Sequence, residues 1–146
     1  MTTVDTTAPS QGDTISFEID LHHRPEKVWR ALTDPALLGE WLLPVVEGKL
    51  EPGSVFMMQT PPQPGWDGTV HCRMLESEPT RKLSYAWVAG DLDTIVTFTL
   101  LPSATGTMLR VVQSGFKPEQ KRNFNGARYG WTMMGGKLVD LLARTP

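Results

Sequence analysis

The alternation of apolar and polar residues predicts a strand near the start of the chain. In the segment ISFEIDL, the apolar residues Ile15, Phe17, Ile19 and Leu21 alternate with polar ones. A period of two is typical of a strand with one buried and one solvated face. The next segment, RPEKVWRALTDPALLGEWL, changes to helical spacing and has a proline at each of two helix starts. It therefore predicts two short helices after the first strand.

Six further runs have the composition of strands and are separated by short turns rich in Gly, Pro and Asp. They cover residues 45–50, 54–60, 68–76, 82–88, 91–101 and 107–114. Short separators favour hairpins, so we expect consecutive strands to pair in an antiparallel meander.

The chain is expected to end in a long helix over residues 118–143. Apolar side chains there recur every three or four residues on one stripe: Phe124, Ala127, Trp131, Met134, Leu138 and Leu141. Strands followed by a segregated helix predict an α+β domain. A strongly curved antiparallel sheet would wrap around this helix.

The same helix contains Gly126, Gly130, Gly135 and Gly136. Each interior glycine costs a helix about 0.5–1 kcal/mol relative to alanine, so their presence needs a reason. Close approach of strands, of the short helices or of a ligand is one explanation. Relief of crowding against Trp29 or Trp41 is the other, and both stay open at this point.

Length and composition fit one domain. The 146 residues can bury a sizeable core, and we expect a single domain over residues 14–146 after a disordered tail over residues 1–13, which are rich in Thr, Ser, Pro and Gly. The net charge of −2, without a basic run, argues against nucleic acid or an anionic membrane surface as partner. No signal-peptide core or long apolar run is present. This predicts no membrane insertion and a cytoplasmic location.

Metal and nucleophile chemistry have little support. The single cysteine, Cys72, excludes an intramolecular disulfide and is more typical of a small core residue than of a nucleophile. His22 and His23 are neighbours, and no carboxylate or thiol spacing completes a metal site around them. We expect no metal and no cofactor. The absence of nucleophile-elbow and phosphate-loop motifs argues weakly against the common nucleophilic and nucleotide-dependent enzymes.

Four segments carry a family resemblance: PEKVWRALTDPALLGEWL, EPTRKLSYAW, TIVTFTLLPSATGTMLRVVQSGF and YGWTMMGGKLVDLL. In this order they resemble the START-like (SRPBCC) helix-grip superfamily, and most closely single-domain, bacterial-type members of the branch named after activators of the heat-shock-protein-90 ATPase. The resemblance covers about residues 14–142. It implies a seven-stranded antiparallel sheet that grips the C-terminal helix around an elongated apolar cavity. The family often has a histidine near the end of the last strand, where this chain has Gln113.

The cavity implied by the resemblance would be lined by residues on the inner faces of the strands and helices. The candidate ligand-binding residues are Trp41, Met58, Trp66, Tyr85, Trp87, Phe98, Gln113, Phe124 and Trp131. Trp66 lies in the loop PPQPGWDG and would either cover the mouth of the cavity or form a contact surface. Methionine and aromatic residues also fill ordinary cores, so this set is equally compatible with packing.

Three functions remain open. The first is non-catalytic binding, carriage or sequestration of a small, mostly apolar molecule, such as a lipid, an aromatic compound or a polyketide-like compound. The second is a cyclase-type or hydrolase-type enzyme that uses Tyr85, His71 or Arg73 inside the cavity. His71 and Arg73 share one strand face, which is either solvent-facing or a polar patch in the cavity. The third is a cochaperone-like interaction module. The protein could be a monomer or a homodimer.

Overall fold

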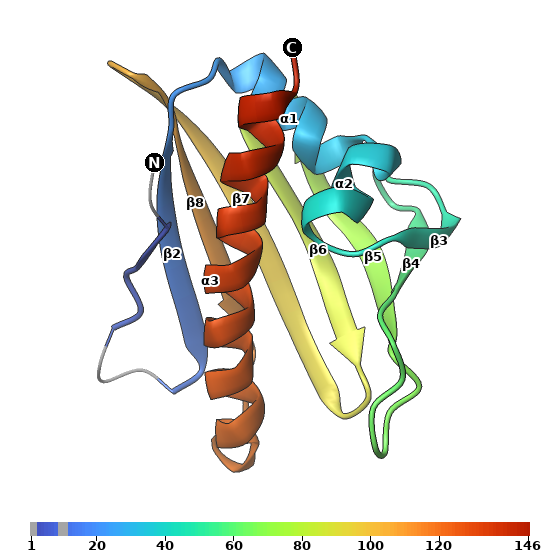
Figure 1. Cartoon of the computed structure of the whole chain (residues 1–146). Helices are drawn as coiled ribbons and strands as arrows, with labels where there is room; N and C mark the ends of the chain where they lie inside the picture. The colour runs from blue at the N-terminus through green and yellow to red at the C-terminus, as the bar shows by residue number, and fades with distance from the viewer. Residues whose placement is uncertain (1–2, 9–11) are drawn as a thin grey trace.

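The computed structural model describes residues 3–8 and 12–146. A curved sheet carries the long helix α3 (Lys121–Arg144) across one face, and α1 (Pro25–Thr33) and α2 (Pro35–Trp41) lie on the same side of the sheet (Figure 1). A short 3-10 helix, η1 (Pro118–Gln120), precedes α3. The described strands are β1 (Thr3–Asp5), β2 (Thr14–Leu21), β3 (Val45–Gly48), β4 (Val55–Gln59), β5 (Thr69–Glu78), β6 (Lys82–Ala89), β7 (Leu92–Ser103) and β8 (Gly106–Ser114). The predicted α+β helix-grip architecture is confirmed.

The sheet is antiparallel throughout its described part, in the order β1-β2-β8-β7-β6-β5-β4-β3. Strands β3 to β8 follow one another as neighbours, as the short turns predict. Strand β2 then pairs with β8, which places the first predicted strand beside the last one. The alternating burial of β2 confirms its period of two, with Ile15, Phe17, Ile19 and Leu21 facing the core.

The sheet has one strand more than the seven expected, because Thr3–Asp5 of the predicted tail forms β1 beside β2. Asp5 also makes a salt bridge of 2.7 Å with Arg128 of α3. Composition could not predict this strand, because Val4 is 51% exposed and the segment is held by backbone pairing and charge rather than by burial. Residues 1–2 and 9–11 of the predicted tail lie outside the described residues.

The new strand also explains one of the helix glycines. A Cβ atom at Gly135 would overlap the side chain of Thr3, so the close approach of β1 requires glycine there. At Gly130 a Cβ would only touch Met134 Cε, at 3.6 Å. Gly126 and Gly136 have no neighbouring atom within 4 Å of such a Cβ, and nothing in the structure explains them. None of the four lies against Trp29 or Trp41 at this range.

The core lies between the sheet and the helices. The predicted α3 stripe faces it, with Phe124, Trp131, Leu138 and Leu141 buried.

Asp34 links α1 to α2, since its side chain accepts a 3.0 Å hydrogen bond from the backbone N–H of Ala36 at the start of α2. The buried stripe holds α3 against the core, and the first half of α3 forms one wall of a cavity.

Candidate ligand cavity

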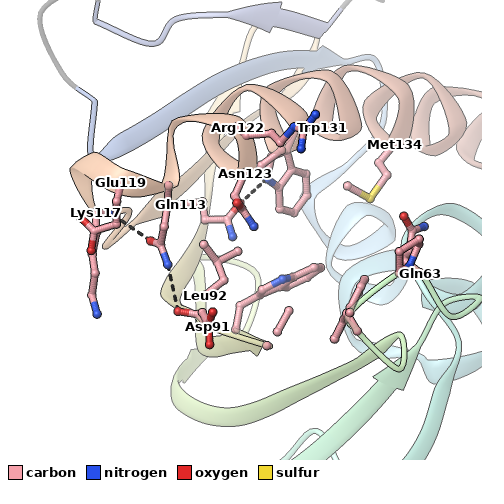
Figure 2. Close-up of a pocket in the computed structure, with 18 residues that line it drawn as sticks. Gln63, Asp91, Leu92, Gln113, Lys117, Glu119, Arg122, Asn123, Trp131 and Met134 are labelled. Atoms are coloured by element: carbon pink, nitrogen blue, oxygen red, sulfur yellow. Dashed lines mark hydrogen bonds between the residues drawn. The ribbon is translucent and has the colours of Figure 1, made fainter.

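A cavity of about 1020 Å³ lies between the first half of α3, the β6–β7 hairpin and the loop that connects β4 with β5 (Figure 2). The loop contributes residues 63–66, and the hairpin contributes residue 87 and residues 89–92. The opposite wall comes from Gln113 of β8 and from the segment that runs from Lys117 to Met134. Three sequence-distant parts of the chain therefore form this cavity together.

Three tryptophans dominate its apolar surface: Trp66, Trp87 and Trp131. The rings of Trp87 and Trp131 have centroids 6.0 Å apart and are tilted by 51° to each other. Trp131 is buried, whereas Trp66 and Trp87 are partly exposed. Indole rings combine a large apolar face with one polar N–H, which suits them to contact aromatic and aliphatic molecules.

The loop that carries Trp66 folds back toward the cavity. Gln63 and Trp66 exchange two backbone hydrogen bonds of 2.9 Å around Pro64 and Gly65. Gly65 has a φ of +80°, the conformation that a type II turn requires at its third position, and proline suits the second. The Trp66 indole then donates a 3.0 Å hydrogen bond to the Thr69 carbonyl. The loop therefore holds the Trp66 ring in a defined position at the cavity wall.

Gln113 connects the cavity walls through a chain of hydrogen bonds. Its Oε1 accepts from the Trp131 indole N–H at 2.9 Å, and its Nε2 donates to Thr94 Oγ1 at 2.9 Å. Thr94 Oγ1 in turn donates to the Trp87 carbonyl at 2.9 Å. Gln113 is 3% exposed, so these bonds are shielded from water. The amide thus orients Trp131 on α3 relative to the strand that carries Trp87.

Gln120, which the sequence interpretation did not identify, closes one end of the cavity. Its Oε1 accepts from the Lys117 backbone N–H and its Nε2 donates to the Asp91 carbonyl, both at 2.9 Å. The first bond caps η1, and the second attaches the start of α3 to the turn between β6 and β7. A glutamine three residues into a helix start is a known capping position, and this signal could have singled it out.

The rim of the cavity carries charges of both signs. Asp91 and Glu119 are acidic, and Lys117 and Arg122 are basic. None of the four forms a salt bridge with a residue that the structure describes. The rim is therefore exposed to solvent and carries both positive and negative charges, while the inner walls carry the aromatic side chains.

The nine candidate residues divide into two groups. Trp66, Trp87, Gln113 and Trp131 line the cavity, whereas Trp41, Met58, Tyr85, Phe98 and Phe124 are buried in the core. In the core group, Trp41 donates to the Ala31 carbonyl at 2.9 Å, and Phe124 packs edge-on against Phe116. Strand periodicity predicts which side chains point inward, but it does not tell whether the inner space is filled by other side chains.

His71 and Arg73 are exposed on the outer face of β5, so they are not a polar patch in the cavity. Cys72 points the opposite way and is buried, and burial raises the pKa of its thiol to about 12. A thiol with such a pKa is a poor nucleophile near neutral pH. The residues proposed for an enzymatic site are therefore not assembled around the cavity.

Within residues 3–8 and 12–146, no group of three or more His, Cys, Asp or Glu side chains is arranged to hold a metal ion. The helices in this part of the chain are also too short or too polar to cross a membrane.

The fold matches several solved structures. Protein MLL2253 from Mesorhizobium loti is 43% identical, with a TM-score of 0.83 over 91% of this chain and 98% of that one. Protein CV1439 from Chromobacterium violaceum is 28% identical, with a TM-score of 0.75 over 91% and 99%. CalU16 from Micromonospora echinospora shares the fold, with 24% identity and a TM-score of 0.76 over 97% and 84%.

No curated protein of described function matches the chain. The family model described as "Activator of Hsp90 ATPase homolog 1-like protein" matches residues 22–143, which is most of the sequence. The structure adds the curved sheet and gripped helix that the sequence resemblance implied. The chain therefore belongs to the Activator of Hsp90 ATPase homolog 1-like family, within the helix-grip superfamily.

Proposed function

We propose that this protein binds a small, mostly apolar molecule in the tryptophan-lined cavity and carries or sequesters it without chemical conversion. The observation that carries the proposal is the cavity of about 1020 Å³ with Trp66, Trp87 and Trp131 in its walls. Cavities that hold drug-sized molecules are of about 300–1,000 Å³ and combine apolar walls with few polar groups. The volume is at the upper end of this range, and the three tryptophans supply apolar walls, while polar side chains make up a larger share of the lining than is usual for such sites.

The chemistry of the walls favours an aromatic or polyketide-like ligand over a flexible lipid. Tilted indole rings offer flat faces to planar molecules, and Met134 adds an adaptable thioether at the same wall. The Gln113 amide is already engaged by Trp131 and Thr94, so binding here would depend mainly on apolar contact. Trp66 would cover the bound molecule from its loop.

The two other functions have less support. An enzyme would need a proton-transferring group beside the ligand, and His71 and Arg73 lie on the outer face of β5. An interaction module would need a contiguous apolar patch. The exposed large apolar side chains are instead spread over five strands and α3. Cytoplasmic location and the choice between monomer and homodimer stay predictions.

The test is a titration followed by tryptophan fluorescence, with a fatty acid, a sterol, a flavonoid and a polycyclic aromatic compound as probes. Ala127→Phe would fill the cavity, because Ala127 lies in its α3 wall. Ala143→Phe makes the same change at an exposed position of α3 and is the matched control. We expect saturable binding of at least one aromatic probe to the wild type and to Ala143→Phe, and loss of binding in Ala127→Phe. Unaltered binding to Ala127→Phe would exclude this cavity as the site.

A further inference from the structure

The hydroxyl of Tyr85 is buried in the core without a hydrogen-bond partner. Tyr85 is 0% exposed, and its Oη contacts no donor or acceptor among the residues that the structure describes. Buried polar atoms are nearly always paired, because removing a hydroxyl from water without a partner is unfavourable. This unpaired hydroxyl therefore needs an explanation.

Tyr85 does not line the cavity, but one aromatic ring connects its ring with the cavity wall. Tyr85 precedes Trp87 by two residues on the same face of β6, a displacement of about 7 Å along the strand. Its ring lies 5.9 Å from that of Phe98, and Phe98 lies 5.9 Å from Trp131 in the cavity wall. Phe98 thus contacts both the Tyr85 ring and the wall.

The two rings that connect Tyr85 with the cavity differ in how they are held. Trp131 is hydrogen-bonded to Gln113, which fixes its position. Phe98 has no polar group and is held by aromatic contacts with Trp41, Tyr85 and Trp131. A rotation of Phe98 would break no hydrogen bond, so it is the easier of the two to displace.

We propose that the Tyr85 hydroxyl is an inner recognition group for the ligand of this cavity, reached when Phe98 moves aside. The ligand would be an elongated apolar molecule with a hydroxyl or carbonyl oxygen at its inner end. The Tyr85 hydroxyl could donate to either kind of oxygen, and it could also accept a hydrogen bond from a ligand hydroxyl. Burial first, and then the neighbouring Cys72, raise the pKa of Tyr85 well above 10, so the group stays neutral and protonated. This inference rests on the proposed function, since it requires a ligand in the cavity.

Two probes of nearly equal shape test it: 4-phenylphenol, which has a hydroxyl, and 4-methylbiphenyl, which has a methyl group in its place. Binding is measured by the NMR shifts of the tryptophan indole N–H groups. We expect the wild type to bind 4-phenylphenol about tenfold more tightly, as one added hydrogen bond implies. Tyr85→Phe should bind both probes with similar affinity, close to that of the wild type for 4-methylbiphenyl.

Thermal unfolding of the free protein provides an independent readout. Tyr85→Phe removes an unpaired buried hydroxyl and should raise Tm, whereas Tyr129→Phe, at a site that is 69% exposed, should leave Tm unchanged. A lower Tm in Tyr85→Phe would show that the hydroxyl has a partner and would overturn the inference.

The binding outcomes separate the two proposals. If the wild type binds both probes equally, or if the preference persists in Tyr85→Phe, the inner recognition group is wrong while the proposed function stands. If neither probe binds to the wild type, the result counts against the proposed function and against this inference with it.

Discussion

The indole N–H of Trp131, in the middle of α3, donates a 2.9 Å hydrogen bond to Gln113 near the end of β8. Both residues are buried, at 3% exposure each. This bond attaches the helix to the sheet at the wall of the cavity, in addition to the apolar contacts of the α3 stripe. The buried Gln113 amide therefore helps to determine the position of the Trp131 ring.

Gln113→Met should destabilise the protein by about 1–3 kcal/mol, because it leaves the buried Trp131 N–H without an acceptor. Thr94 Oγ1 also loses the bond that it accepts from Gln113 Nε2, but it keeps its own bond to the Trp87 carbonyl. Urea unfolding gives the free energy. Gln63→Met at the exposed rim is the control and should have little effect. Equal stability of Gln113→Met and wild type would contradict this role of the amide.

Gly135→Ala and Gly136→Ala should change stability in opposite directions. Gly136 faces open space, so alanine there should stabilise the helix by about 0.5–1 kcal/mol. At Gly135 the added methyl group would overlap Thr3 and displace β1, so this variant should be less stable than the wild type. Thermal unfolding followed by circular dichroism compares the two. A stabilised Gly135→Ala variant would mean that β1 does not pack there in solution.

His23 should make stability depend on pH. Burial first, and then the nearby Lys27 and His22, lower the pKa of His23 below its usual 6.5. As the pH falls to 6.5 and below, His23 therefore becomes protonated in the unfolded chain while it is still neutral in the folded protein. The stability contributed by this group is present above pH 6.5 and is lost as the pH falls through the lowered pKa of the folded state.

Urea unfolding between pH 7.5 and pH 5 should show this loss in the wild type and a smaller loss in His23→Gln. An identical pH profile for wild type and His23→Gln would rule out His23 as its source.

Cys72 should be unreactive in the native protein. Its thiol is buried, and burial raises its pKa to about 12. An Ellman's-reagent assay at pH 8 should give slow modification of the folded protein and rapid modification in urea. Fast native modification would show that the region around β5 opens readily.

The sequence patterns predicted the elements that bury many side chains. The alternation in ISFEIDL and the stripe that contains Trp131 and Leu138 each repeat over several positions, so burial leaves a clear signal. Strand β1 left no such signal, because its contacts are backbone pairing and the salt bridge from Asp5 to Arg128.

The candidate site could be predicted only in part. Trp87 and Phe98 both point inward, yet one lines the cavity and the other is packed in the core. Their difference depends on how α2 and α3 fill the space above the sheet, which no periodicity along one strand encodes. The capping position of Gln120 can be recognised in the sequence, but its bond to the backbone carbonyl of Asp91 cannot, because a main-chain acceptor has no signature in the sequence.

The pairing of β2 with β8 has a consequence for how the chain folds. The register joins Thr14 to Ser114 and Leu21 to Thr107, so β2 can pair with β8 only after the whole meander from β3 to β8 exists. Closing so long a loop is slow compared with forming the local hairpins. The edge of β2 that pairs with β8 must therefore stay without its partner through most of synthesis, and the step that completes the sheet should limit the folding rate.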